Sequence, residues 1–324
     1  MVKYFPETFM NPREQRIIAA ADKGDVNTMN DALFKFVLGK EDAKHLTIDF
    51  LNAALGPDLS KPIEDLTFLQ TENSPKQVLG KETRFDVACR LDSGERVDVE
   101  VQVLDQNNMR RRTYYYWSQL YQRDFCRGAA YESLSPALTV NVLDFVLFED
   151  DPNPYSWWST YNSVTHKRFG RDLSFFFLEI PKFERIPHSG GHFSPIERWM
   201  CYFSPRTSLQ AKDSLLEDDV MQETLNRTKH FFNNEIERQR YIDAEIARMD
   251  YESAIKGSLE KGHKEGLREG LREGLREGES KVQNSTIPQL LREGLSPEAL
   301  ARIFALPLEE VFAIARQHGV TAAH

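Results

Sequence analysis

Apolar and polar positions alternate strictly along two neighbouring segments of the chain. Apolar residues occupy the odd-numbered positions from Phe85 to Leu91 and again from Val97 to Val103. This period of two is typical of β-strands that bury one face and expose the other. The intervening Asp92-Ser93-Gly94 suits a three-residue hairpin loop, in which a type I turn is followed by glycine in the left-handed conformation. The pattern therefore predicts a β-hairpin.

The loop length predicts which residues face one another across this hairpin. Leu91 faces Glu95, so the numbers of paired residues sum to 186, and Asp86 lies opposite Glu100. A slip of one residue would set Asp86 against the apolar face of the second strand. Directly opposed residues place their Cβ atoms about 5 Å apart, where two like charges are destabilising. Two carboxylates in this position suggest a divalent cation shared between them.

The pattern elsewhere predicts an α/β domain with a mixed sheet, in the order α, β, β, β, α, β. Helices are expected from a cap at Asn30 or Asp31 to Gly39, from Asp42 to Leu55, and from Met109 to Arg127 after a cap at Asn107 or Asn108. Strands are expected at 66–71, at 138–148 and at 173–180, in addition to the hairpin. The second of these is mostly apolar, which favours a strand covered on both faces.

The C-terminal third is predicted to be helical, and it contains a repeat of Glu-Gly-Leu-Arg from Glu265 to Gly278. A Glu–Arg pair three residues apart stabilises a helix by about 0.2–0.5 kcal/mol, whereas each interior glycine costs about 1 kcal/mol. An isolated helix is therefore marginal here, which leaves a linker or a self-associating helix. Beyond it, a helix-turn-helix-like unit is predicted, with its core formed by Leu300, Ile303, Val311 and Ile314. Acidic residues begin its last helix, which favours protein contact over base recognition.

Composition limits the class of protein. The 324 residues are 40% hydrophobic, enough for a substantial core, but no apolar run approaches the roughly 20 residues that span a bilayer. The N-terminus lacks a signal-peptide pattern and the three cysteines are isolated, so we expect a cytoplasmic protein without a membrane partner. A net charge of −9 argues against non-specific nucleic-acid binding by the whole surface. No phosphate-binding loop is present, so no nucleotide cofactor is expected.

Asp86, Glu100 and Gln102 on a strand pair within this order resemble the active site of the PD-(D/E)XK nuclease superfamily. The segment from Asn30 to Lys35, the Arg- and Tyr-rich helix and the Glu-Gly-Leu-Arg repeat extend the likeness to the PD-(D/E)XK nuclease family transposases, relatives of the recombination-promoting nucleases. The resemblance implies a restriction-endonuclease-like core (αβββαβ, with a mixed sheet) and a helical C-terminal extension. The expected segments are 1–26 at the N-terminus, 27–205 as the nuclease-like domain, 206–255 as a helical extension, 256–283 as the repeat and 284–320 as the helix-turn-helix-like unit.

The resemblance also implies a metal-dependent DNA endonuclease that hydrolyses phosphodiester bonds. Asp86 and Glu100, with the Val101 carbonyl, would hold Mg²⁺, or Mn²⁺ or Ca²⁺ in its place, because these cations prefer oxygen ligands. Gln102 stands where the superfamily most often has lysine; it can orient an attacking water but brings no positive charge. The proline of the motif is also absent, because Phe85 precedes Asp86.

The implied partner is DNA, and the C-terminal helices are candidates for forming a homo-oligomer. Candidate DNA-binding residues are Lys35, Arg84, Arg110, Arg111 and Arg112. Arg84, expected opposite Gln102, would supply the charge that Gln102 lacks. Asp98 is expected to be solvated, and the aromatic stripe of the Arg- and Tyr-rich helix is expected to pack in the core rather than stack on bases. The alternative function is a catalytically weak DNA-binding or protein-interaction protein that keeps the nuclease fold.

Overall fold

The computed structural model describes residues 11–70, 72–73, 83–186, 193–205 and 215–320. The chain forms two compact units, Met1–Arg248 and Met249–His324. The strands are β1 (Leu66–Phe68), β2 (Glu72–Asn73), β3 (Thr83–Arg84), β4 (Val87–Leu91), β5 (Arg96–Gln102), β6 (Ala137–Leu143), β7 (Tyr155–Ser159) and β8 (Leu173–Glu179). The helices of the first unit are α1 (Pro12–Asp22), α2 (Asp31–Leu38), α3 (Lys44–Leu55), α4 (Met109–Tyr121), α5 (Ile180–Phe183), α6 (Pro195–Phe203) and α7 (Asp219–Phe231). Helix α8 (Glu235–Arg292) begins in this unit and continues into the second, which also contains α9 (Pro297–Ile303) and α10 (Leu308–Gln317).

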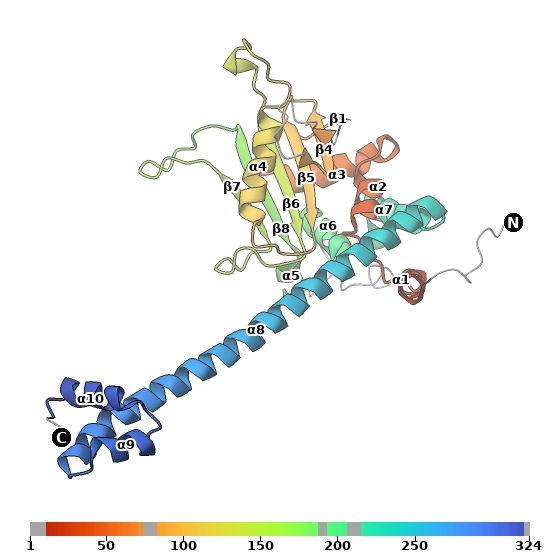
Figure 1. Cartoon of the computed structure of the whole chain (residues 1–324). Coiled ribbons are helices and arrows are strands. Elements are labelled where there is room, and N and C mark those ends of the chain that lie inside the picture. Colours follow the sequence, from red (N-terminus) through yellow and green to blue (C-terminus); the bar gives the residue numbers. More distant parts are fainter. Residues whose placement is uncertain (1–10, 71, 74–82, 187–192, 206–214, 321–324) are drawn as a thin grey trace. The chain divides into compact units, whose positions relative to one another are not determined.

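A mixed six-stranded sheet forms the centre of the first unit, in the order β1-β4-β5-β6-β8-β7 (Figure 1). Strands β5, β6 and β8 run parallel, whereas β1 and β4 on one side and β7 on the other are antiparallel to their neighbours. Parallel strands need a crossover connection, and α4 supplies it between β5 and β6. The predicted αβββαβ order and mixed sheet are confirmed, while β7 on the edge was not predicted.

The predicted register of the hairpin is confirmed, because Val87 pairs with Val99 and Ala88 with Asp98. Gly94 takes a φ of 103° and its amide donates to the Leu91 carbonyl over 2.9 Å, as the three-residue loop requires. The ladder ends at Val87, however, and the chain bends at Asp86.

Beyond the bend, two sequence-based expectations are wrong. Arg84 pairs with Glu72 of β2, not with Gln102. Phe85 packs its ring edge-to-face against Tyr116 of α4, with ring centroids 5.6 Å apart, so it lies with Ala88 in the core beneath α4 rather than with Val87. The bend at Asp86 interrupts the alternation on which both expectations depended.

The expectation of an exposed face on the hairpin is also wrong, because both faces of β5 are covered. Helix α4 lies across one face (Figure 1), and all residues from Arg96 to Val101 are buried. On the other face the backbone of Gly39, directly after α2, closely approaches Val87. The Tyr155 hydroxyl of β7 donates to the Ala54 carbonyl of α3 over 2.7 Å. Polar side chains on the α4 face of β5 are therefore enclosed.

Helices α2, α3 and α6 share an aromatic core that positions α2 beside the sheet. Phe50 packs edge-to-face against Trp199 and Phe203, with ring centroids 5.2 and 5.6 Å away. The predicted cap at Asn30 is confirmed, since its side chain accepts from the first amides of α2. The Asn30 amide also donates to Glu245 of α8 over 2.9 Å. These contacts fix the start of α2, and with it the position of Lys35 one turn later.

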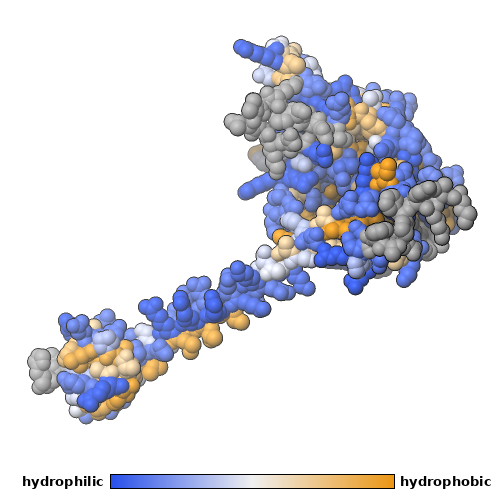
Figure 2. All heavy atoms as spheres, turned by 45° about the vertical axis from the view of Figure 1, so that its right-hand side comes forward, coloured by the Kyte–Doolittle hydropathy of each residue, from blue (hydrophilic) through white to orange (hydrophobic). Residues whose placement is uncertain are grey.

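The second unit contains the remainder of α8 together with α9 and α10. Helix α8 continues through the Glu-Gly-Leu-Arg repeat, where Leu267, Leu271 and Leu275 are exposed on a hydrophobic flank visible in Figure 2. Ser296 caps α9, because its side chain accepts from the Ala299 amide. The unit has its own core of Ile287, Leu300, Val311 and Ile314. Ile303 is 63% exposed, so its predicted place in this core is wrong. None of the helices in the described ranges is both long enough and apolar enough to cross a membrane.

Candidate active site

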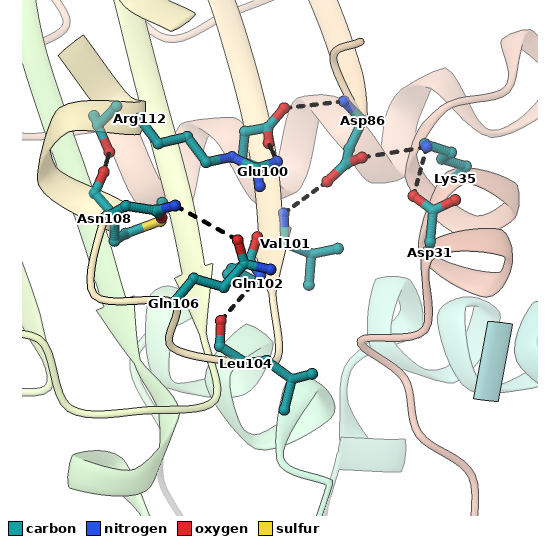
Figure 3. A network of polar contacts seen from close by, with 12 residues as sticks. Asp31, Lys35, Asp86, Glu100, Val101, Gln102, Leu104, Gln106, Asn108 and Arg112 are labelled. Atoms are coloured by element: carbon teal, nitrogen blue, oxygen red, sulfur yellow. Dashed lines mark hydrogen bonds and ion pairs between the residues drawn. The ribbon is translucent and has the colours of Figure 1, made fainter. Parts of the chain in front are cut away.

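The Glu100 carboxylate contacts the backbone of Asp86 at the point where the chain bends before β4 (Figure 3). The Asp86 amide donates to Glu100 Oε1 over 3.2 Å, and the Val101 amide donates to Asp86 Oδ2 over 3.0 Å. Both side chains are shielded: that of Asp86 is 13% exposed and that of Glu100 is 3% exposed. The hairpin thus brings together the two residues that the register predicts, although they touch through the bend rather than across a ladder pair.

Lys35 of α2 places a positive charge against Asp86. Its Nζ lies 3.2 Å from Asp86 Oδ1 and 2.5 Å from Asp31 Oδ1. Burial alone would lower the pKa of Lys35, but the two carboxylates outweigh it and raise that pKa. Lys35 therefore remains charged and bridges the start of α2 to the bend.

Arg112 of α4 likewise places a positive charge against Glu100. Its Nη2 donates to Glu100 Oε2 over 2.9 Å, and its guanidinium lies 4.8 Å from the centroid of the Tyr116 ring. The sequence suggested Arg112 as a DNA-binding residue; in the structure its side chain turns inward against a buried acid, and its contact with DNA stays a prediction. The reason is its position on α4, two residues after the exposed Arg110 and so on the opposite flank of the helix.

Burial opposes ionisation of the two acids despite these cations. It raises the pKa of Asp86 to about 6, with Lys35 acting in the opposite direction. Burial, followed by the charge of Asp86, raises the pKa of Glu100 to about 8, against the effect of Arg112. Two carboxyl groups whose charge is this costly form a site that a further cation would stabilise.

Asp98 is a third acid on the same face of β5, and the expectation that it is solvated is wrong. Its side chain is fully buried, and neither carboxylate oxygen meets a hydrogen-bond donor among the residues that the structure describes. Burial, and then the charges of Glu100 and Asp86, raise the pKa of Asp98 well above its ordinary value. The cover supplied by α4, which strand alternation alone does not reveal, encloses this residue.

A family model described as PD-(D/E)XK nuclease family transposase matches residues 28–258, most of the chain. The chain belongs to this family. A search of curated proteins and a search of solved structures found no match. The matched segment contains Lys35, Asp86, Glu100 and Arg112, so the whole cluster lies within the part that defines a PD-(D/E)XK nuclease family transposase. The resemblance inferred from the sequence is confirmed.

The residue that follows the second acid in this PD-(D/E)XK protein, Val101, contributes its amide to Asp86, and its carbonyl stays a predicted metal ligand. Gln102 is half-buried and its amide donates to the Leu104 carbonyl over 3.0 Å. Its role in orienting a water therefore stays a prediction. The positive charge missing from Gln102 is present at Lys35 and Arg112 instead.

The other predicted DNA contacts lie at the surface. Arg84, Arg110 and Arg111 are all exposed, the last two in the first turn of α4. Arg110 rests over the Phe148 ring, 5.1 Å from its centroid. The N-terminus of a helix attracts negatively charged groups, and the positive charges of Arg110 and Arg111 strengthen that attraction.

Proposed function

We propose that this family member is a metal-dependent DNA endonuclease of the transposase-like or recombination-promoting type, which hydrolyses phosphodiester bonds. The observation that supports this most strongly is the contact between Asp86 and Glu100, two shielded acids joined through the Asp86 amide over 3.2 Å. Membership of a nuclease family gives the pair its expected substrate.

The residues present suit Mg²⁺. Among the described residues, no three His, Cys, Asp or Glu side chains gather as ligands. This is compatible with Mg²⁺, which is usually bound through one or two carboxylates together with water and substrate phosphates. Asp86 and Glu100 would hold the ion, with the Val101 carbonyl as a further ligand; Mn²⁺ and Ca²⁺ suit the same oxygens. When bound, such an ion neutralises charge on the phosphate and lowers the pKa of a bound water.

Lys35 and Arg112 each form an ion pair with one of the two carboxylates. Lys35 contacts one oxygen of Asp86 and Arg112 contacts one oxygen of Glu100. To free those oxygens, the two side chains must withdraw from them, and their charges then become available to phosphate oxygens. In this proposal, Lys35 and Arg112 stabilise the charge that develops on the phosphate, and Gln102 orients the attacking water.

The test is cleavage of supercoiled plasmid by the full-length protein in Mg²⁺, Mn²⁺, Ca²⁺ or EDTA. Asp86→Asn and Glu100→Gln are compared with Glu132→Gln, which neutralises an exposed acid of a surface turn instead. Circular dichroism checks that each variant folds. We expect metal-dependent cleavage by the wild type and Glu132→Gln, and a loss of at least about 100-fold in both site variants, since a metal ion contributes several kcal/mol to such a step.

Cleavage that survives both site substitutions would overturn the proposed site. If the wild type binds DNA but cleaves in no metal, the alternative holds, namely a catalytically weak binding protein that keeps the nuclease fold. One feature of the structure favours that alternative, because a cationic side chain already contacts one oxygen of each acid.

We also propose that the C-terminal helices assemble copies of the chain. The exposed leucines of α8 recur every four residues through the repeat, beside glycines that leave open space at their Cβ positions. The segment boundaries given above, with residues 27–205 as the nuclease-like domain, belong to the same proposal. Sedimentation of the full chain with and without Leu267→Lys, Leu271→Lys and Leu275→Lys would test it: unchanged mass would count against assembly through this flank.

A further inference from the structure

A hollow outside the proposed active site lies on the flank of α4 that faces β7 and β8. It is a cavity of about 320 Å³ whose walls include Tyr114, Phe148, Trp158 and Phe175. This volume is at the lower end of the range for small-molecule sites, which suits one planar ring system better than a larger ligand. Nothing in the proposed hydrolysis uses these residues.

The aromatic side chains around this cavity present open ring surface. Tyr114 is 58% exposed and Trp158 is 45% exposed, although both are large and largely apolar. Trp158 stacks on Phe148, with ring centroids 4.7 Å apart and planes 24° apart, while Tyr114 stands edge-on to Phe175. Clustered aromatic surface of this kind favours the stacking of a nucleobase that has left its helix.

A cation stands at the edge of the same cavity. The Arg110 guanidinium lies over Phe148 and donates through one nitrogen to the Leu147 carbonyl over 3.3 Å. Arginine carries five N–H donors, so this single bond leaves others available to a phosphate. An aromatic cleft with an arginine at its rim matches a nucleotide, whose base is flat and whose backbone is anionic.

Hydrogen bonds and an ion pair fix the backbone of the cavity wall that carries Phe148. The amides of Leu147 and Phe148 donate to Glu179 Oε1, and the Phe148 carbonyl accepts from Lys182 Nζ over 2.7 Å. Lys182 Nζ also lies 2.6 Å from Glu179 Oε2, and both side chains are buried. Removing one partner of a buried pair is costly, so the loop has little freedom to move. This wall of the cavity is therefore preformed.

We propose that this cavity binds a single unstacked nucleobase of the DNA substrate. The inference rests on the proposed function for the identity of the ligand, but it concerns a different part of the surface. Arg112 points from α4 toward the carboxylates, whereas Arg110 and Tyr114 lie on the flank of the cavity. A strand that passes the first turn of α4, where Arg110 and Arg111 are exposed, can place a phosphate on one side and a base on the other.

The experiment compares two duplexes of one sequence in EDTA, where no cleavage occurs. One is fully paired and the other carries a single unpaired 2-aminopurine, whose fluorescence falls on stacking. We expect the full-length protein to bind the unpaired probe about 5- to 100-fold more tightly and to quench it, which corresponds to the ordinary contribution of one stacked base. Trp158→Ala and Tyr114→Ala should each lose most of this preference, and Trp158→Phe should retain it. Tyr131→Ala, which removes a 79% exposed aromatic outside the cavity, should also retain it.

The outcomes separate the two proposals. Equal binding of both probes, with no effect of Trp158→Ala or Tyr114→Ala, would overturn the nucleobase site and leave the endonuclease proposal intact. Binding of neither probe in EDTA, with neither binding nor cleavage when Mg²⁺ is added, would remove both, because DNA would not be a ligand at all. Circular dichroism of each variant, together with retained binding of the paired duplex, shows that a lost preference does not come from unfolding.

Discussion

Substitution of Asp98 by asparagine should stabilise the metal-free protein, increasingly so as pH rises. The side chain is fully buried, and its two oxygens meet no donor within the described residues, so its ionised form is strongly disfavoured. Asparagine has almost the same shape and never ionises. The wild type and Asp98→Asn should therefore have similar stability at low pH, at which Asp98 is protonated in both the folded and the unfolded chain.

The sign and size follow from proton binding. The pKa of Asp98 is raised in the folded protein, so the folded chain keeps a proton that the unfolded chain loses near pH 4. Stability of the wild type consequently falls as pH rises from about 4 to the raised pKa, by about 1.4 kcal/mol per pH unit for this group. Between about pH 5 and pH 8, the advantage of Asp98→Asn should grow by up to about 4 kcal/mol.

Urea unfolding in EDTA, followed by tryptophan fluorescence at several pH values, measures this difference. All four tryptophans, Trp117, Trp157, Trp158 and Trp199, belong to the first unit, so unfolding of the second unit does not contribute to the signal. Glu132→Gln is the control, because it neutralises an exposed acid. A free-energy difference between Asp98→Asn and the wild type that stays constant from pH 5 to pH 8 would refute the view that the fold holds Asp98 uncharged.

Three further predictions concern other parts of the first unit. Gly94→Ala should destabilise it by about 1–3 kcal/mol in urea unfolding, because a φ of 103° strains any side chain although open space surrounds the position; an unchanged midpoint would contradict this account of the hairpin loop. Lys182→Met should cost about 3–5 kcal/mol by leaving Glu179 buried and unpaired, and adding Glu179→Gln should recover much of it; a harmless single substitution would show that the pair does not hold the loop. Lys35→Met should tighten Mg²⁺ binding in calorimetry because it removes the cation that contacts Asp86; the titration is run at a pH above 8, since loss of Lys35 raises the pKa of Asp86 above the value of about 6 that it has beside this lysine, and unchanged or weaker binding would mean that Lys35 does not compete for that carboxylate.

The hairpin shows how far the sequence determines the site. Alternation and the three-residue loop were sufficient for the register, because a slip by one residue exposes a whole apolar face. The proximity of Asp86 and Glu100 followed from that register. The bend that separates Asp86 from β4 did not follow from the register, because it is local and leaves the pattern of apolar and polar residues unchanged.

The environment of the site depended on packing that no single segment encodes. Asp98 was expected in solvent and Arg112 on DNA, because polar residues on one strand face, and on an arginine-rich helix start, are usually exposed. The structure lays α4 over that face, which buries Asp98 and brings Arg112 to Glu100. Strand β7 was not predicted because Tyr155–Ser159 lacks alternation. The cavity, which Trp158 of this strand lines, was therefore not predicted either.

Under the proposed function, the two cations held by the acids would connect metal binding to DNA binding. In the structure, Lys35 forms an ion pair with Asp86 and Arg112 forms one with Glu100. An ion that replaces them on these carboxylates releases positive charge toward the substrate, so metal should raise the affinity for DNA. Coupling between two ligands is reciprocal, and DNA must then raise the affinity for metal by the same factor. The proposed endonuclease would then fill its metal site mainly when a substrate is already in place.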